Sequence, residues 1–136
     1  MRTIKHFIRT LISGAAIFAV FGLVSTVAAA ATVNAIYNSA TDVPVAATGY
    51  KATGNTVNFT LNFAPAPGTE LMVVNNTWLE FINGTFNNLS NGQAVALSYG
   101  GTLYNFVANY YGGNGNDLVL VWANTRPFAW GYNNAG

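Results

Sequence analysis

TVNFTLNF, residues 56–63, is the stretch that decides the fold class of this chain. Its odd positions are all apolar, and its even positions are all Thr or Asn. This strict alternation is the period of a β-strand that is buried on one face only. The sequence APAPG at residues 64–68 ends the strand, because proline cannot donate to a ladder and glycine permits a turn. The centre of the chain is therefore predicted to be β-structure.

Short strands are also predicted on both sides of this stretch. Asn and Gly separate them and favour turns, whereas Thr, Val, Tyr and Phe favour strands. No window after residue 31 has the 3.6-residue apolar period of a capped helix. We therefore expect an all-β fold of short antiparallel hairpins, which form a sandwich or roll, or else the cap of a β-solenoid. The predicted strands are residues 32–37, 56–63, 70–75, 78–83, 93–99, 103–111 and 118–123.

Residues 1–31 have the three parts of an export signal. Three basic residues lie within the first nine positions, an apolar run covers residues 11–27, and four alanines follow it. A signal helix cleaved after Ala30 or Ala31 is therefore expected, and with it a secreted or cell-surface protein. The alternative is a permanent membrane anchor, but about 17 apolar residues are near the lower limit for a span and no basic cluster follows. No stable membrane span is expected after cleavage.

Acids and bases are scarce outside this leader. Residues 32–136 contain two bases and four acids, which leaves a net charge of −2. No basic patch remains to bind phosphates, so a nucleic-acid partner is not expected. The same residues include neither His nor Cys, which excludes Ser-His-Asp and Cys-His catalysis and a zinc site. We expect a protein that is not an enzyme and holds no cofactor. The remaining catalytic alternative is a carboxylate pair of Glu70 and Glu80 that hydrolyses glycosides.

One glycine-rich string has the pattern of a calcium-binding nonapeptide. GGNGNDLVL, residues 112–120, fits a motif in which tight glycine turns and an Asp offer oxygen ligands. The candidate ligand loop consists of Gly113, Gly115 and Asp117. Only one copy occurs, whereas calcium takes six to eight oxygens, so a hairpin turn before a buried strand is favoured over a metal site.

Aromatic side chains are the other candidate functional groups. An exposed row of them would stack on sugars or dock a partner, and the alternative is that they fill the core. The candidate ligand-facing aromatics are Trp78, Tyr110, Tyr111 and Trp122.

Two stretches resemble parts of known secreted proteins. Residues 66–122 carry N-N-T, G-x-F-x-x-L, G-x-x-V, G-x-x-Y and a final Y-x-G-G-x-G-N-D-L-V-L. This pattern resembles a β-rich, autotransporter-like passenger segment of large secreted proteins from verrucomicrobial and planctomycete-type bacteria. The end of the chain, residues 127–136, contains A-W-G-x-N-x-x-G and resembles the opening of a regulator-of-chromosome-condensation repeat, one blade of a propeller. One incomplete blade cannot bury its own faces, so the resemblance implies a fragment of a longer chain.

The domain organisation expected from these observations has three parts. Residues 1–31 are the signal peptide, residues 32–124 a β-domain, and residues 125–136 the start of a truncated propeller-type repeat. The expected function is that of a non-catalytic structural or interaction module in a secreted or cell-surface bacterial repeat protein, with a protein or a cell-surface glycan as partner. The alternative is an extracellular carbohydrate-binding or adhesin β-domain that uses surface aromatics.

Overall fold

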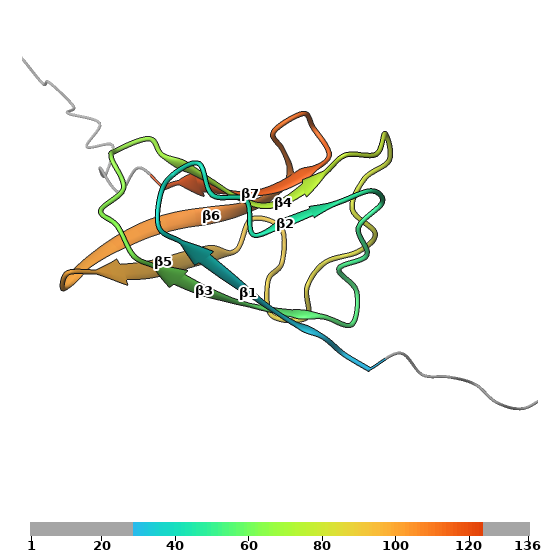
Figure 1. Ribbon diagram of the computed structural model, residues 1–136, viewed down its shortest axis with the longest axis horizontal. Coiled ribbons are helices and arrows are strands. Elements are labelled where there is room, and N and C mark those ends of the chain that lie inside the picture. Colours follow the sequence, from blue (N-terminus) through green and yellow to red (C-terminus); the bar gives the residue numbers. More distant parts are fainter. Residues whose placement is uncertain (1–28, 124–136) are drawn as a thin grey trace, which may run out of the picture.

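The computed structural model describes residues 29–123. Residues 1–28 of the expected signal peptide and the expected propeller-type segment, residues 125–136, lie outside this range. Within it the fold is all-β, as predicted, with seven strands and no helix (Figure 1). The strands are β1 (Thr32–Tyr37), β2 (Val45–Ala47), β3 (Thr56–Leu61), β4 (Glu70–Asn76), β5 (Ala94–Tyr99), β6 (Thr102–Gly112) and β7 (Asp117–Trp122).

The strands form two sheets. Five of them make a mixed sheet of order β2-β4-β7-β6-β5, which curves into a half-barrel, and β1 and β3 make a separate parallel pair. Strands β5, β6 and β7 are joined by two tight antiparallel hairpins. The first hairpin turns at Gly100 and Gly101, which have φ values of +57° and +80°. Glycine has no Cβ and therefore adopts these left-handed conformations without strain.

The strand pairs in the first half of the domain are parallel, whereas antiparallel hairpins were expected. Strand β1 pairs with β3, and β2 pairs with β4, both in parallel. A parallel bridge between Lys51 and Asn83 follows the same order along the chain. Residues 32–51 and 56–83 therefore form two successive passes of the chain. In the second pass β3 lies beside β1, β4 beside β2 and Asn83 beside Lys51.

Two strand predictions need correction. Residues 78–83 were expected to form a strand, but residues 77–82 lie in a loop and Asn83 makes only a single bridge. The short strand β2 has a weak pattern of its own and was not predicted.

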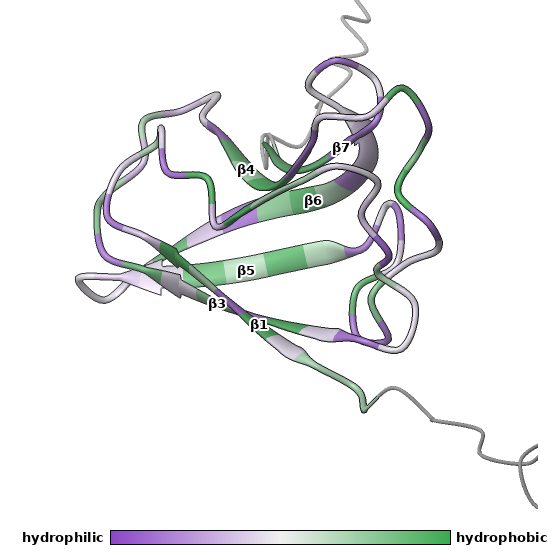
Figure 2. Cartoon of the chain, turned by 45° about the vertical axis from the view of Figure 1, so that its right-hand side comes forward, coloured by the Kyte–Doolittle hydropathy of each residue, from purple (hydrophilic) through white to green (hydrophobic). Residues whose placement is uncertain are grey.

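The core lies between the half-barrel and the β1–β3 pair. The predicted alternation of β3 is confirmed, because Val57 and Leu61 are buried and the Asn and Thr face of the strand is largely exposed. Tyr37 of β1 joins the two layers, since its hydroxyl donates to the carbonyl of Met72 in β4 at 2.9 Å. Figure 2 shows apolar residues concentrated on β4 to β7 and polar residues in many connecting loops. The largest fully buried apolar side chains are Tyr37, Phe86, Phe106, Leu71, Leu118, Leu120, Val73 and Val74.

Candidate functional site

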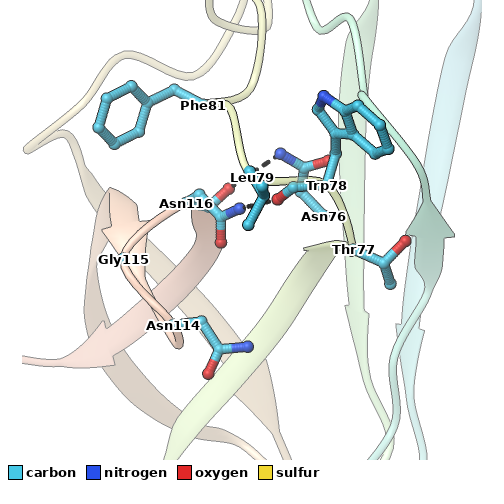
Figure 3. Close-up of a pocket in the computed structure, with 8 residues that line it drawn as sticks. All are labelled: Asn76, Thr77, Trp78, Leu79, Phe81, Asn114, Gly115 and Asn116. Carbon is cyan, nitrogen blue, oxygen red and sulfur yellow. Dashed lines mark hydrogen bonds between the residues drawn. The ribbon is translucent and has the colours of Figure 1, made fainter.

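A groove lies where the loop after β4 meets the turn between β6 and β7. We call residues 77–81 the Trp78 loop and residues 113–116 the glycine turn. The groove between them has a volume of about 490 Å³ (Figure 3). This volume is within the range of about 300–1,000 Å³ that is usual for small-molecule sites. Its lining residues are Asn76, Thr77, Trp78, Leu79, Phe81, Asn114, Gly115 and Asn116.

Two asparagine side chains hold the backbone of the Trp78 loop. Asn76 is only 2% exposed, and its Nδ2 donates to the carbonyl of Glu80 at 2.7 Å. Its Oδ1 accepts a hydrogen bond from the backbone amide of Gly49 at 3.0 Å. From the other side of the groove, the Nδ2 of Asn116 donates to the carbonyl of Trp78. The loop is therefore fixed through its backbone, and its side chains are left free to face outward.

Asp117 joins the glycine turn to the end of β4. Its side chain is 1% exposed, and its Oδ1 accepts from the backbone amide of Asn76 at 2.7 Å. Its Oδ2 accepts from the backbone amide of Asn114 at 3.0 Å. A buried carboxylate needs such partners, because an unpaired charge away from water is strongly unfavourable.

The candidate calcium loop is built as a hairpin turn. Gly113 and Gly115 have φ values of +55° and +104°, and a Cβ on Gly113 would come within 2.1 Å of the Asp117 carboxylate. Both carboxylate oxygens of Asp117 point at backbone amides of the protein itself. Among residues 29–123, no three His, Cys, Asp or Glu residues lie close enough to hold a metal ion together. These contacts support the turn interpretation over the calcium one.

The Trp78 loop displays apolar side chains to solvent. Trp78 is 53% exposed, Leu79 is 95% exposed and Phe81 is 64% exposed. Phe81 also packs edge-on against Tyr111 of β6, which is 59% exposed, with 5.5 Å between ring centroids. Single exposed apolar residues are common, but a group of four on a fixed loop and its neighbour indicates an interaction surface.

The other two candidate aromatics pack inside the domain. Tyr110 is 5% exposed, and its hydroxyl donates to the carbonyl of Leu89 at 2.7 Å and accepts from the amide of Phe86 at 2.9 Å. Burial raises the pKa of this phenol above its ordinary value. Trp122 is half-buried and lies edge-on against Phe106. Of the four candidate aromatics, only Trp78 and Tyr111 therefore belong to the exposed group.

Leu79 and Phe81 were not predicted as part of a site. Their stretch has the composition of a strand, and strand side chains of this kind normally fill a core. The polar residues that keep these side chains outside, Asn76 and Asn116, are 40 residues apart in the sequence. Only their hydrogen bonds to the loop carbonyls reveal the arrangement.

The carboxylates Glu70 and Glu80 do not form a pair. Glu70 begins β4, whereas Glu80 lies in the loop beyond the other end of that strand. A strand rises about 3.4 Å per residue, so β4 alone separates the two by about 20 Å. The carboxylates of a glycosidase lie about 5–9.5 Å apart. The glycosidase alternative therefore has no geometric support.

The described residues also contain no helix that is long and apolar enough to cross a membrane. In comparisons with known proteins, no family model, no curated protein and no solved structure matches the chain.

Proposed function

We propose that this protein is a non-catalytic structural and interaction module of a secreted or cell-surface bacterial repeat protein. The observation that carries the proposal is the parallel stacking of two successive passes of the chain, in which β1 and β3 align like side chains in register. In a repeat protein each unit buries its faces against its neighbours, so stacked units of similar sequence are the expected building block.

The stacked side chains form a polar ladder on the outer face of β1 and β3. Both strands begin a T-V-N-x-x-x-N sequence, at residues 32–38 and 56–62, and the register aligns the two copies. The hydroxyls of the two threonines lie 3.0 Å apart. The Nδ2 of Asn62 donates to the Oδ1 of Asn38 at 2.9 Å, and the second asparagine pair of the ladder has a separation of 3.4 Å. Ladders of stacked asparagines stabilise parallel, in-register strands.

This arrangement favours the β-solenoid cap among the all-β folds that we considered. The two parallel passes correspond to two coils, with β1, β2 and Lys51 in the first and β3, β4 and Asn83 in the second. The antiparallel strands β5 to β7 then close one side of the core. The resemblance of residues 66–122 to passenger segments of secreted bacterial proteins agrees with such a role.

Two parts of the proposal, export and the lack of catalysis, are supported by the sequence of the leader and by the positions of the acidic residues. The leader has the parts of a signal peptide. The acids of the described residues are dispersed, since Glu70 begins β4 and Glu80 lies beyond the other end of that strand. Asp42 and Asp117 each accept backbone hydrogen bonds. A rigid domain that presents a surface needs no reactive group, which fits this composition.

A tandem insertion tests the repeat architecture. A second copy of residues 32–55 is inserted directly before Thr56, which adds one coil at the 24-residue spacing that the register shows. We expect a monomer with a single urea transition at a midpoint equal to or above that of the parent. A scrambled 24-residue insert of the same composition is the control and should be cut rapidly by protease. If the tandem insert is cut as fast as the scrambled one, the coil proposal is wrong.

Processing of the intact precursor tests the location. With an epitope tag after Gly136, we expect the tagged protein outside the cell membrane, with its N-terminus at Ala31 or Thr32. A precursor that keeps residues 1–31 and stays with the cytoplasm or inner membrane would refute export.

A further inference from the structure

We propose that the groove between the Trp78 loop and the glycine turn binds a neutral carbohydrate chain. The inference rests on the proposed role as an interaction module and names the surface and the ligand class. It starts from the way in which the Trp78 loop is built.

The loop holds its apolar side chains in place before any ligand arrives. The carbonyls of Trp78 and Glu80 accept hydrogen bonds from Asn116 and Asn76, so the backbone on both sides of Leu79 is fixed. Asp117 in turn fixes the amide of Asn76. Binding to a preorganised surface avoids the loss of entropy that ordering a flexible loop would require. Buried polar contacts thus hold a loop whose large apolar side chains are exposed to water. If these side chains served only to fill the core, no such contacts would be needed to hold them outside it.

Two apolar platforms flank the groove. Figure 3 shows the rings of Trp78 and Phe81 on opposite sides of it, with Leu79 between them. Tyr111 extends the Phe81 platform through its edge-on contact. A second hollow of about 240 Å³ is lined by Phe81, Tyr111 and Asn91 among others, so Phe81 borders both hollows. A ligand that reaches both platforms must be extended, so an oligosaccharide fits better than a single sugar.

The polar lining of the groove is neutral. No charged side chain is among the lining residues. Asn114 offers a side-chain amide, and Asn116 offers its Oδ1, since its Nδ2 holds the Trp78 carbonyl. Thr77 adds a hydroxyl that also pairs with the Thr48 Oγ1 at 2.9 Å. Such groups both donate and accept, as sugar hydroxyls do. The Oδ1 of Asn116 is buried and has no hydrogen-bond partner among the described residues. In Figure 3 this oxygen points away from Asn76, toward the side of the groove where Asn114 lies. Aromatic faces combined with a few orienting amides are the general chemistry of a site for a neutral polar ligand.

The same chemistry argues against an anionic membrane surface as the ligand. Attraction to anionic lipids requires clustered Lys and Arg. Lys51 is the one base in the part of the chain that the structure describes, and it does not line the groove. Aromatic stacking with neutral hydrogen bonding is therefore the mode of recognition that the groove favours.

Titration calorimetry with neutral hexasaccharides tests the inference. The panel contains β-1,4-glucan, β-1,3-glucan, chitin, mannan and xylan hexamers, and the protein is the chain from Thr32 to Gly136. We expect at least one of them to bind. Trp78→Ala and Phe81→Ala should each weaken that binding about tenfold or more, because each removes one platform. Tyr99→Ala, at an exposed aromatic on β5 outside the groove, is the matched control and should bind as the parent does. All three variants should keep the urea midpoint of the parent within about 0.5 M, because these side chains are exposed.

Three results would overturn the inference. The first is that no member of the panel binds with a dissociation constant below 10 mM. The second is that binding is unchanged in Trp78→Ala and Phe81→Ala. The third is that the chain binds vesicles of phosphatidylcholine and phosphatidylserine, and no hexasaccharide, in a manner that depends on Trp78. None of these results would affect the tandem-coil experiment, so failure of the glycan site and failure of the structural module are distinguishable.

Discussion

Replacing Asp117 by alanine should destabilise the domain more than replacing an exposed polar side chain does. The carboxylate is 1% exposed and accepts from the amides of Asn76 and Asn114. Alanine leaves the amide of Asn76, a residue that is 2% exposed, without an acceptor, and an unsatisfied buried donor costs about 1–3 kcal/mol. The amide of Asn114 belongs to an exposed residue and can bond to water instead. We therefore predict a loss of about 1–3 kcal/mol from a total stability of about 5–15 kcal/mol for a domain of this size.

Urea unfolding followed by tryptophan fluorescence measures this loss. With a urea dependence of about 1–3 kcal/mol per M, the midpoint should fall by at least about 0.3 M. Asp117→Asn is the matched control, because it keeps one acceptor oxygen in a side chain of the same shape and should therefore lose less stability. If Asp117→Ala unfolds within about 0.5 kcal/mol of the parent, the buried carboxylate does not hold the glycine turn to β4 and this reasoning is wrong.

Three further substitutions test a buried hydroxyl, a hydrogen-bonded carboxylate and a tightly packed glycine. Tyr110→Phe removes a hydroxyl with two buried backbone partners and should lower the free energy of unfolding by about 1–3 kcal/mol in urea titrations. Asp42→Asn should be less stable than the parent at pH 7. Backbone hydrogen bonds lower the Asp42 pKa, so that difference should shrink as the pH falls below about 4, and a difference constant from pH 7 to pH 2 would contradict this. Gly84→Ala should cost more than Gly49→Ala, because both glycines have a φ of +71° but only a Cβ at Gly84 would meet Thr53; equal urea midpoints would exclude the clash.

The strands with clear alternation could be predicted from the sequence, but the direction of their pairing could not. The apolar positions of residues 56–63 specify which face is buried, and that prediction is confirmed at Val57 and Leu61. A period of two is the same in parallel and antiparallel strands, so it does not identify a partner. The hairpins at residues 100–101 and 112–116 were predictable because a short glycine turn permits only an antiparallel return. The connections from β1 to β3 and from β2 to β4 are long, and their parallel register follows from stacking of the two passes.

The candidate site was predicted in part for a similar reason. Trp78 and Tyr111 were named as candidates, but composition does not distinguish an exposed aromatic from a buried one. Tyr110 and Tyr111 are adjacent in β6 and point to opposite faces, so one is buried and the other is exposed. Residues 78–83 were mistaken for a strand because the carbonyls of Trp78 and Glu80 bond to the side chains of Asn116 and Asn76 and not to a neighbouring strand.

By itself the sequence determined the all-β class, the two glycine hairpins and the scarcity of reactive groups, because these follow from local conformational preference and from the inventory of side chains. Only the tertiary structure decided that β1 and β3 pair in parallel, that Asp117 serves as a buried acceptor for two amides, and that the Trp78 loop faces water. Most of the contacts involved join residues at least 24 positions apart. The exceptions are the Asn114 amide, three positions from Asp117, and the Glu80 carbonyl, four positions from Asn76. Local patterns carry no information about such contacts, since the free energy that selects them is gained only when the two segments meet.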